Sequence, residues 1–294
     1  MLTQSAPRTL QFRSLSPHGF HRVVYYEWGE AANPRVVVCV HGLGRNGRDF
    51  DVIAEALAPT HRVLAVDMPG RGMSDWLADP ADYIFPTYLA TLTALIARSG
   101  AVDVDWIGTS MGGLLGIVIA AQPKSPIRRL VVNDVGPQLE AAALARIGGY
   151  IGQDPTFATF SEIEAYLRQI SAPFGPLSDL QWEFVTRTNV RERADGRWGL
   201  AYDPGIAVPF RNAPAPPNLW PLWDAITCPA LVLRGAQSDL LSREVAGEMA
   251  ARGPRPRIVT FDPWTWPRRG RLISTVVSGE TRGSPFSFLA IPSR

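Results

Sequence analysis

Residues 108–113, Gly-Thr-Ser-Met-Gly-Gly, constrain the fold of this chain more than any other segment. They follow an apolar run that ends at Ile107 and precede a run of small and apolar residues over 111–121, a pattern typical of a strand, a sharp turn and a helix. A serine on such a turn has a strained backbone, and the glycines at 108 and 112 avoid side chains that would collide there. The turn raises the Ser110 hydroxyl above a sheet edge, at a helix N-terminus whose N–H groups can hold an oxyanion. Ser110 is therefore the candidate nucleophile.

Short apolar runs alternate with helical stretches along most of the chain, which predicts a doubly wound, mostly parallel α/β sheet. The runs are continuously apolar, as strands buried on both faces of a parallel sheet are, and we predict strands over 23–28, 35–40, 62–66, 102–107, 127–132, 230–233 and 257–261. Helices are predicted over 50–57, 88–97, 111–121 and 243–250.

The alternation stops at Gly136, and the chain is helical, aromatic and locally proline-rich from there to about residue 223. We therefore expect a helical cap over 137–223, inserted between two strands of a core formed by 1–136 and 224–262. The aromatic residues of this region are expected to form the small core of the cap or an apolar pocket for aromatic or medium-chain acyl groups. They are Tyr150, Phe157, Phe160, Tyr166, Phe174, Trp182, Trp198, Tyr202, Phe210, Trp220 and Trp223.

Composition limits the possible partners. The 294 residues carry a net charge of +2 with no basic stripe, so nucleic acid is not expected as a partner. No Cys/His cluster has metal-binding spacing, and Cys39 and Cys228 are expected to be small core residues. No signal peptide and no run of membrane length is found, which predicts a cytoplasmic protein that does not span a membrane. A small-molecule substrate without a cofactor fits these observations.

Four motifs, in this order, resemble those of the α/β-hydrolase superfamily, and the resemblance runs from about residue 7 to residue 261. His41-Gly42-Leu43-Gly44 resembles the oxyanion-side loop, residues 67–74 resemble the turn after the next strand, Ser110 matches the nucleophile elbow, and 234–239 resemble the loop of the triad acid. The resemblance implies the α/β-hydrolase fold with an inserted cap and a Ser, acid, His triad. It also implies oxyanion donors at the backbone N–H groups of Leu43 and Met111.

The resemblance implies an acid after one of two strands. Asp239 follows the apolar run 231–233, at the carboxyl end of a strand, where α/β sheets place their sites. A helix N-cap is the structural alternative for this residue. Asp134 is the alternative acid, because some members of the family use the preceding strand, and its structural alternative is a turn. We expect Asp239, and not Asp134, to lie beside Ser110.

No catalytic histidine can be assigned. The four histidines, His18, His21, His41 and His61, all precede Ser110, whereas the triad base should follow Asp239. His41 is expected to order its loop.

The family has a Gly-x-Gly-His loop where this chain has Asp262-Pro263-Trp264-Thr265-Trp266-Pro267. Codons for the Pro-Trp-Thr-Trp-Pro segment, read one base later, give x-Gly-x-Gly followed by His, Leu, Pro or Arg. We therefore hypothesise that 263–294 are a frameshifted tail.

Three functions follow from these observations. The first is serine-dependent hydrolysis of an ester or a carbon–carbon bond in a small apolar or aromatic substrate, with cofactor-free haloperoxidase as a lesser option and with activity impaired by the missing histidine. The second is a catalytically dead relic or a binding module. The third is NAD binding through Gly42-x-Gly44-x-x-Gly47, with Asp67 as the ribose-binding acid. Against the third, Asp67 opens a Pro-Gly-x-Gly turn that it is expected to tie down, and the elbow would go unexplained.

Overall fold

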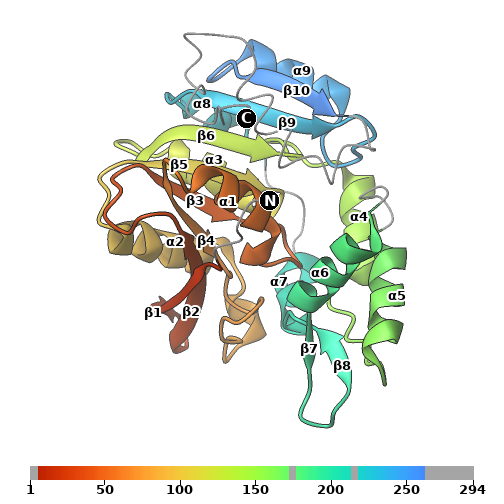
Figure 1. Cartoon of the computed structure of the whole chain (residues 1–294). Coiled ribbons are helices and arrows are strands. Elements are labelled where there is room, and N and C mark those ends of the chain that lie inside the picture. The colour runs from red at the N-terminus through yellow and green to blue at the C-terminus, as the bar shows by residue number, and fades with distance from the viewer. Residues whose placement is uncertain (1–5, 172–176, 213–217, 262–294) are drawn as a thin grey trace.

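A computed structural model describes residues 6–171, 177–212 and 218–261 (Figure 1). Its centre is an eight-stranded sheet in the order β1-β2-β4-β3-β5-β6-β9-β10. The strands pair in parallel from β4 to β10, whereas β1 and β2 pair antiparallel with each other and β2 pairs antiparallel with β4. Their bounds are β1 (Arg8–Ser16), β2 (Gly19–Trp28), β3 (Val36–Val40), β4 (Arg62–Val66), β5 (Val104–Thr109), β6 (Ile127–Asn133), β9 (Ala230–Gly235) and β10 (Arg257–Phe261).

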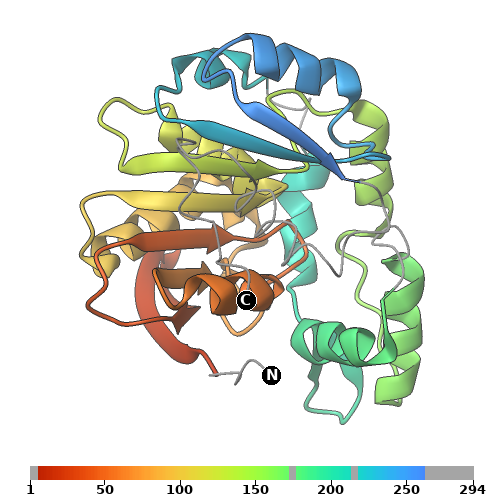
Figure 2. The same ribbon diagram turned by 45° about the horizontal axis from the view of Figure 1, so that its top comes forward.

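Helices cover both faces of the sheet, as the alternation of apolar runs predicts (Figures 1 and 2). One apolar cluster joins the sheet to α2 (Phe85–Ser99), α3 (Met111–Ala120) and α9 (Arg243–Ala251). A second cluster joins the opposite face to α1 (Asp51–Leu57). Short 3₁₀ turns η1 (Gly47–Phe50) and η2 (Pro80–Asp82) complete the loops. Among the helices that the structure describes, none combines the length and hydrophobicity that a membrane span requires.

Between β6 and β9 the chain leaves the sheet and forms a separate layer beside the carboxyl ends of the strands (Figure 1). Capping boxes start α5 at Thr159 and α6 at Ser178. A two-stranded antiparallel hairpin also lies here, although the sequence predicts only helices. The elements are α4 (Ala141–Tyr150), α5 (Phe160–Ile170), α6 (Asp179–Asn189), β7 (Val190–Glu192), β8 (Trp198–Leu200), η4 (Pro204–Ile206), α7 (Ala207–Asn212) and α8 (Trp220–Ala225).

Helix α8 differs from the rest of this segment because it contacts α3 and so lies against the sheet. Its Trp223 is fully buried. The division into a core and a cap at 136/137 and 223/224 stays a prediction, and Phe174 and the hypothesised frameshifted tail, 263–294, fall outside the described residues.

Backbone hydrogen bonds join this layer to the turn that follows β4. Arg71 and Tyr202 form a β-bridge, Gly72 N–H donates to the Ala201 carbonyl at 2.8 Å, and Asp203 N–H donates to the Gly70 carbonyl at 2.7 Å. These backbone bonds join segments that are more than a hundred residues apart in sequence, so the position of the layer depends on the turn.

The glycine at the start of α3 provides a test of the packing. A Cβ on Gly112 would lie 2.0 Å from the Val40 carbonyl oxygen, whereas a Cβ on Gly247, inside α9, would meet nothing within 4 Å. We expect Gly112→Ala to lower the free energy of unfolding by about 3 kcal/mol or more, because backbone must move. Gly247→Ala should raise it by about 0.5–1 kcal/mol, since alanine favours the helix. Urea unfolding measures both, and equal effects of the two substitutions would contradict this packing.

Candidate active site

Ser110 lies at the junction of β5 and α3 with φ 50° and ψ −116°, a conformation that residues with a side chain rarely adopt. The turn is held by its backbone: Ser110 N–H donates to the Asn133 carbonyl at 2.9 Å, and the Ser110 carbonyl accepts from the Gly113 and Leu114 N–H groups. A Cβ on Gly108 would lie 2.2 Å from the Gly112 carbonyl oxygen, which is the collision that the sequence predicts. The strand, turn and helix expected around Ser110 are present.

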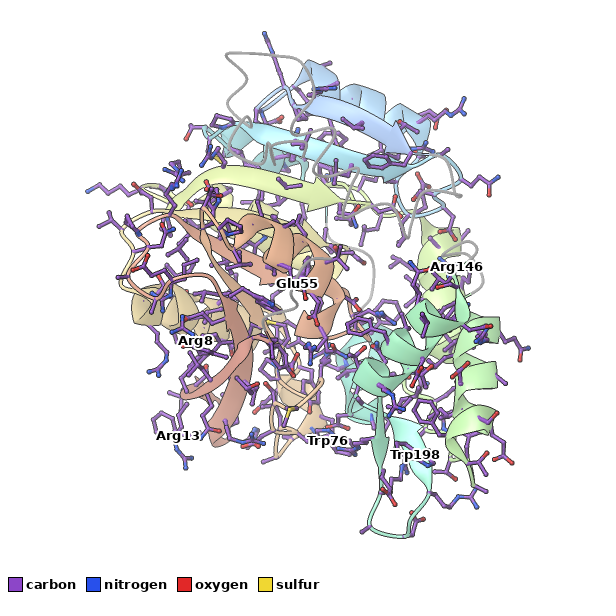
Figure 3. The ribbon with its side chains drawn as sticks, in the orientation of Figure 1. Arg8, Arg13, Glu55, Trp76, Arg146 and Trp198 are labelled. Atoms are coloured by element: carbon purple, nitrogen blue, oxygen red, sulfur yellow. The ribbon has the colours of Figure 1, made fainter. Side chains whose placement is uncertain are left out.

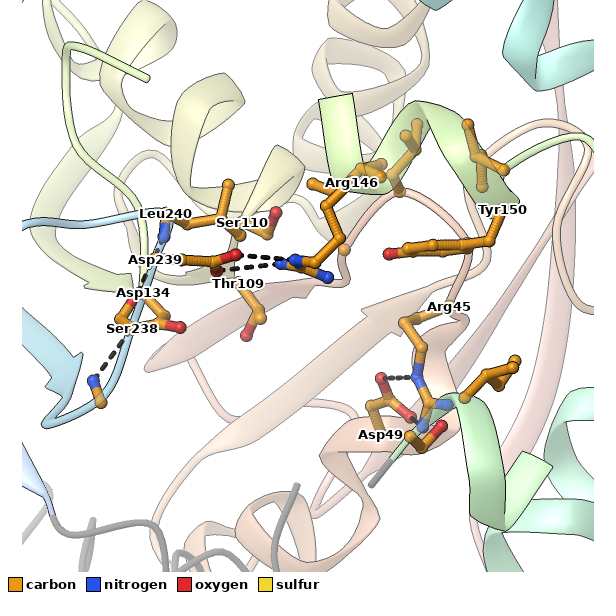
Figure 4. A pocket seen from close by; sticks show the side chains of 18 of the residues that line it. Arg45, Asp49, Thr109, Ser110, Asp134, Arg146, Tyr150, Ser238, Asp239 and Leu240 are labelled. Atoms are coloured by element: carbon orange, nitrogen blue, oxygen red, sulfur yellow. Dashed lines mark hydrogen bonds and ion pairs between the residues drawn. The ribbon is translucent and has the colours of Figure 1, made fainter. Parts of the chain in front are cut away.

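Ser110 lines a cavity of about 370 Å³ between the carboxyl ends of the strands and the helices α4 and α5 (Figure 4). The sheet side of the cavity comes from the loops after β3, β5, β6 and β9. Three of the four sequence motifs lie in the loops after β3, β5 and β9, whereas residues 67–74, after β4, do not line the cavity. The opposite side is mostly apolar and aromatic. Its residues include Ile147, Tyr150, Ile151, Tyr166, Leu167, Ile170 and Tyr202. The cavity therefore offers a polar floor and an apolar wall to a small molecule.

Leu43 belongs to the loop after β3, which passes directly beside the serine. A Cβ on Gly42 would lie 3.6 Å from the Ser110 Cβ. The peptide that joins Gly42 to Leu43 is held through its carbonyl, which accepts a hydrogen bond from His41 Nδ1 at 2.7 Å. Met111 is the first residue of α3, so its N–H has no partner within the helix. Both residues expected to supply oxyanion donors thus adjoin the serine.

Both ring nitrogens of His41 form hydrogen bonds with backbone groups. It is fully buried; its Nδ1 donates to Gly42, and its Nε2 accepts from the Met68 N–H at 3.0 Å. Burial lowers the pKa of His41 to about 3, so the ring stays neutral near pH 7. A ring with both nitrogens occupied orders its loop and has none left to accept a proton from Ser110.

The other histidines lie elsewhere. Within the described part of the chain, none of the four histidines lines the cavity. His18 pairs with Asp82 at 3.0 Å, and His21 lies in β2. His61 directly precedes β4, next to Thr60, whose hydroxyl contacts its Nδ1 at 2.8 Å. The described lining of the cavity thus includes none of His18, His21, His41 and His61, and the absence of a catalytic histidine stays a prediction.

Asp239 faces a cation across the cavity. Its carboxylate accepts hydrogen bonds from Arg146 Nε at 2.6 Å and Nη2 at 2.9 Å, and Arg146 projects from α4 (Figures 3 and 4). The guanidinium holds the pKa of Asp239 below its usual range. The two side chains are 52% and 48% exposed, so the pair contributes little to stability, typically about 0–1 kcal/mol.

Asp134 lies at the end of β6 and lines the same cavity. Its backbone has φ 57°, its N–H donates to the Leu233 carbonyl at 2.8 Å, and its Oδ1 accepts from the Gly235 N–H at 2.9 Å. The expectation that Asp239 alone lies here is not met, because both carboxylates border the cavity. The choice of Asp239 as the acid therefore stays a prediction.

The nucleotide alternative finds no support in this geometry. Asp67, which would bind ribose, is fully buried and accepts hydrogen bonds from Gly47 N–H at 2.7 Å, Met73 N–H at 2.8 Å and Tyr26 hydroxyl at 3.1 Å. Burial raises its pKa to about 6. The carboxylate ties down its own turn and the start of η1, so it is not available to a ligand.

Comparison with known proteins agrees with the fold. The model of the alpha/beta hydrolase family matches residues 37–270, and the chain belongs to this family. It is 50% identical over 258 residues to a 3-hydroxybutyrate-oligomer hydrolase of Cupriavidus necator, covering 85% of this chain and 88% of that protein.

Two solved structures share the fold. An alpha/beta hydrolase of Novosphingobium aromaticivorans is 38% identical with a TM-score of 0.78, covering 88% of this chain and 91% of that one. A putative hydrolase of Rickettsia typhi is 26% identical with a TM-score of 0.85, and the match covers 94% of this chain and 100% of that one.

The buried histidine makes a prediction about pH. The pKa of His41 is lower in the folded protein than in the unfolded chain, so the unfolded chain binds its proton first as the pH falls below about 6.5. His41→Gln should therefore lower the free energy of unfolding most at pH 7. The difference in this free energy between the parent and the variant should shrink by roughly 1.4 kcal/mol for each pH unit toward pH 5. Urea unfolding at several pH values measures this difference.

His18→Gln is the matched control, because the hydrogen bond that the His18 ring donates to the Asp82 carboxylate raises the pKa of His18. The sign is then opposite: the His18 interaction stabilises at low pH and is lost as the pH rises. A difference for His41→Gln that grows toward pH 5 would show that the His41 ring is charged in the folded protein.

Proposed function

We propose that this chain has the architecture of a serine-dependent ester hydrolase, with Ser110 as the nucleophile, Asp239 as the acid and the Leu43 and Met111 N–H groups as oxyanion donors. The observation that supports this proposal most directly is the strained Ser110 turn at the floor of a cavity that Leu43 and Asp239 also line. In such a site the hydroxyl oxygen attacks an acyl carbon, and the charge that develops on the carbonyl oxygen is stabilised by the two N–H groups.

Short esters of hydroxy acids are the proposed substrates. The 50% identical relative is named for hydrolysis of 3-hydroxybutyrate oligomers, and that similarity extends over most of both chains. The cavity volume, about 370 Å³, falls in the range of small-molecule sites. Its apolar wall suits the alkyl part of a hydroxyacyl unit, and its polar floor suits the ester. Cleavage of a carbon–carbon bond remains the other chemistry that the family resemblance suggests.

Proton transfer is the step for which the described cavity provides no histidine. The attacking hydroxyl must lose a proton and the leaving alkoxide must gain one, and a histidine performs both transfers in a complete triad. Here no histidine borders the described cavity, and Asp239 is paired with Arg146 instead of an imidazole. Loss of one triad member costs roughly 10⁴–10⁶ in turnover. We therefore propose that this sequence has strongly impaired activity.

A binding module is the second candidate, favoured by the same ion pair. Arg146 occupies both oxygens of the carboxylate that the imidazole would need, and the cavity is otherwise complete. Such a protein would bind an ester without cleaving it, and Ser110-dependent cleavage of the bound ester would distinguish an enzyme from this candidate.

Turnover tests the proposal. The chain with the present sequence should hydrolyse p-nitrophenyl butyrate negligibly, and Ser110→Ala should scarcely change the rate. A chain in which the shifted reading frame is restored after Asp262 should be faster by at least about 10³, if that frame encodes the histidine. The rate of p-nitrophenolate release measures both.

Two controls accompany the assay. Ser110→Ala in the frame-restored chain should remove the gain, and Asp239→Asn should reduce turnover far more than Asp134→Asn if Asp239 is the acid. Fast, Ser110-dependent hydrolysis by the present sequence would contradict the proposal, and a shifted frame without a histidine codon would end the frameshift hypothesis.

A further inference from the structure

Arg71 is a fully buried cation in the turn after β4, and its guanidinium contacts both residues proposed as oxyanion donors. Its Nε donates to the Leu43 carbonyl at 2.9 Å, and its Nη2 lies 3.8 Å from the Met111 sulfur. Its Nη1 donates to the Pro69 carbonyl at 2.6 Å and to the Tyr88 hydroxyl at 2.8 Å. In the part of the chain that the structure describes, Arg71 forms no ion pair with a carboxylate.

Burial of this charge is expensive unless its donors are satisfied. The guanidinium lies 5.5 Å from the ring centre of Tyr83 and 5.1 Å from that of Tyr88, which offsets part of the cost. An apolar side chain of similar size would fill the same space without that cost. An apolar side chain could not, however, donate a hydrogen bond to the Leu43 carbonyl while it also contacts Met111.

The hydrogen bond from Arg71 restrains the backbone of Leu43. The peptide before Leu43 is fixed by His41 through the Gly42 carbonyl, and the peptide after it is fixed by Arg71 through the Leu43 carbonyl. Both torsions of Leu43 are thereby restrained, so its N–H has one direction. The positive charge of Arg71 is also fully buried close to this loop, where it favours a developing oxyanion.

The same residue contacts the layer that covers the site. The backbone of Arg71 bridges to Tyr202, and both of its neighbours hydrogen-bond to this segment: Gly72 to Ala201 and Gly70 to Asp203. Tyr83, whose ring faces the guanidinium, donates its hydroxyl to the Asp203 carboxylate at 2.5 Å. A shift of this segment would therefore move Arg71 and, through it, Leu43.

We propose that Arg71 is the positioning residue of this site: it restrains the Leu43 peptide beside Ser110, holds the Met111 side chain at the start of α3, and couples both to the docking of segment 201–203. The meaning of this arrangement as an oxyanion site rests on the proposed function. The positioning itself does not, because it concerns only the backbone that Arg71 holds.

Backbone NMR of the full chain tests the positioning. Arg71→Met should lower the order parameter of the Leu43 amide from about 0.85 toward 0.6 and should shift the Met111 amide resonance. Arg71→Lys should do the same, because one ammonium cannot reproduce the planar fork. Arg62→Met is the matched control: Arg62 lies at the other end of β4, where it donates to Glu27 and the Ser99 carbonyl, and its loss should leave both amides unchanged.

Binding of butylboronic acid by the frame-restored chain is the second readout, since a boronate on an activated Ser110 places an oxygen at the oxyanion position. We expect Arg71→Met to weaken binding at least tenfold relative to Arg62→Met. Unchanged Leu43 and Met111 amides in Arg71→Met, or full recovery in Arg71→Lys, would overturn the positioning role. Altered amides with equal boronate binding by the frame-restored chain and its Ser110→Ala variant would support that role and refute the serine chemistry proposed above.

Discussion

The close approach of α3 to the sheet is the constraint on which the rest of this structure depends. No side chain fits at Gly112, because a Cβ there would lie 2.0 Å from the Val40 carbonyl oxygen, and none fits at Gly108. The buried Trp106 indole donates to the Gly112 carbonyl at 3.0 Å and fixes the start of the helix. The turn between strand and helix must then be sharp, and the strain falls on Ser110. Neighbouring strands hold that strain, so the hydroxyl is fixed relative to the loops after β3 and β6.

Three buried polar side chains determine the shape of the loops after β3 and β4. His41, Asp67 and Arg71 are all fully buried, and each bonds mainly to backbone groups of the loops around it. Each carries a desolvation cost, which is visible in the lowered pKa of His41 and the raised pKa of Asp67. Such residues stabilise one conformation of a loop more than they stabilise the fold. The desolvation of these three side chains lowers the stability of the protein, and their hydrogen bonds fix the loop geometry around Ser110.

The sequence predicted most of the sheet, because parallel strands buried on both faces are continuously apolar and the glycine pair has one steric explanation. The strand β1 was missed, since Arg8–Ser16 is an edge strand with polar residues, although its alternation of Leu10, Phe12 and Ser14 was a usable signal. The hairpin β7–β8 has three residues in each strand, too few for any periodicity.

Side-chain pairing was the other limit of the sequence. Arg146 and Asp239 are 93 residues apart, and nothing in the pattern joins them. The contacts of Arg71 with Leu43 and Met111 likewise depend on how three loops fold together.

We propose that the strained serine and its surrounding loops lack a base that activates the hydroxyl, because none of the four histidines lines the cavity formed by the described residues. Covalent labelling with a fluorophosphonate measures that activation directly, because only an activated serine reacts at an appreciable rate. With the present sequence, intact-protein mass spectrometry should find no more label on the parent chain than on Ser110→Ala. Stoichiometric labelling of Ser110 within minutes would contradict the account and would require a base that is not one of the four histidines described above.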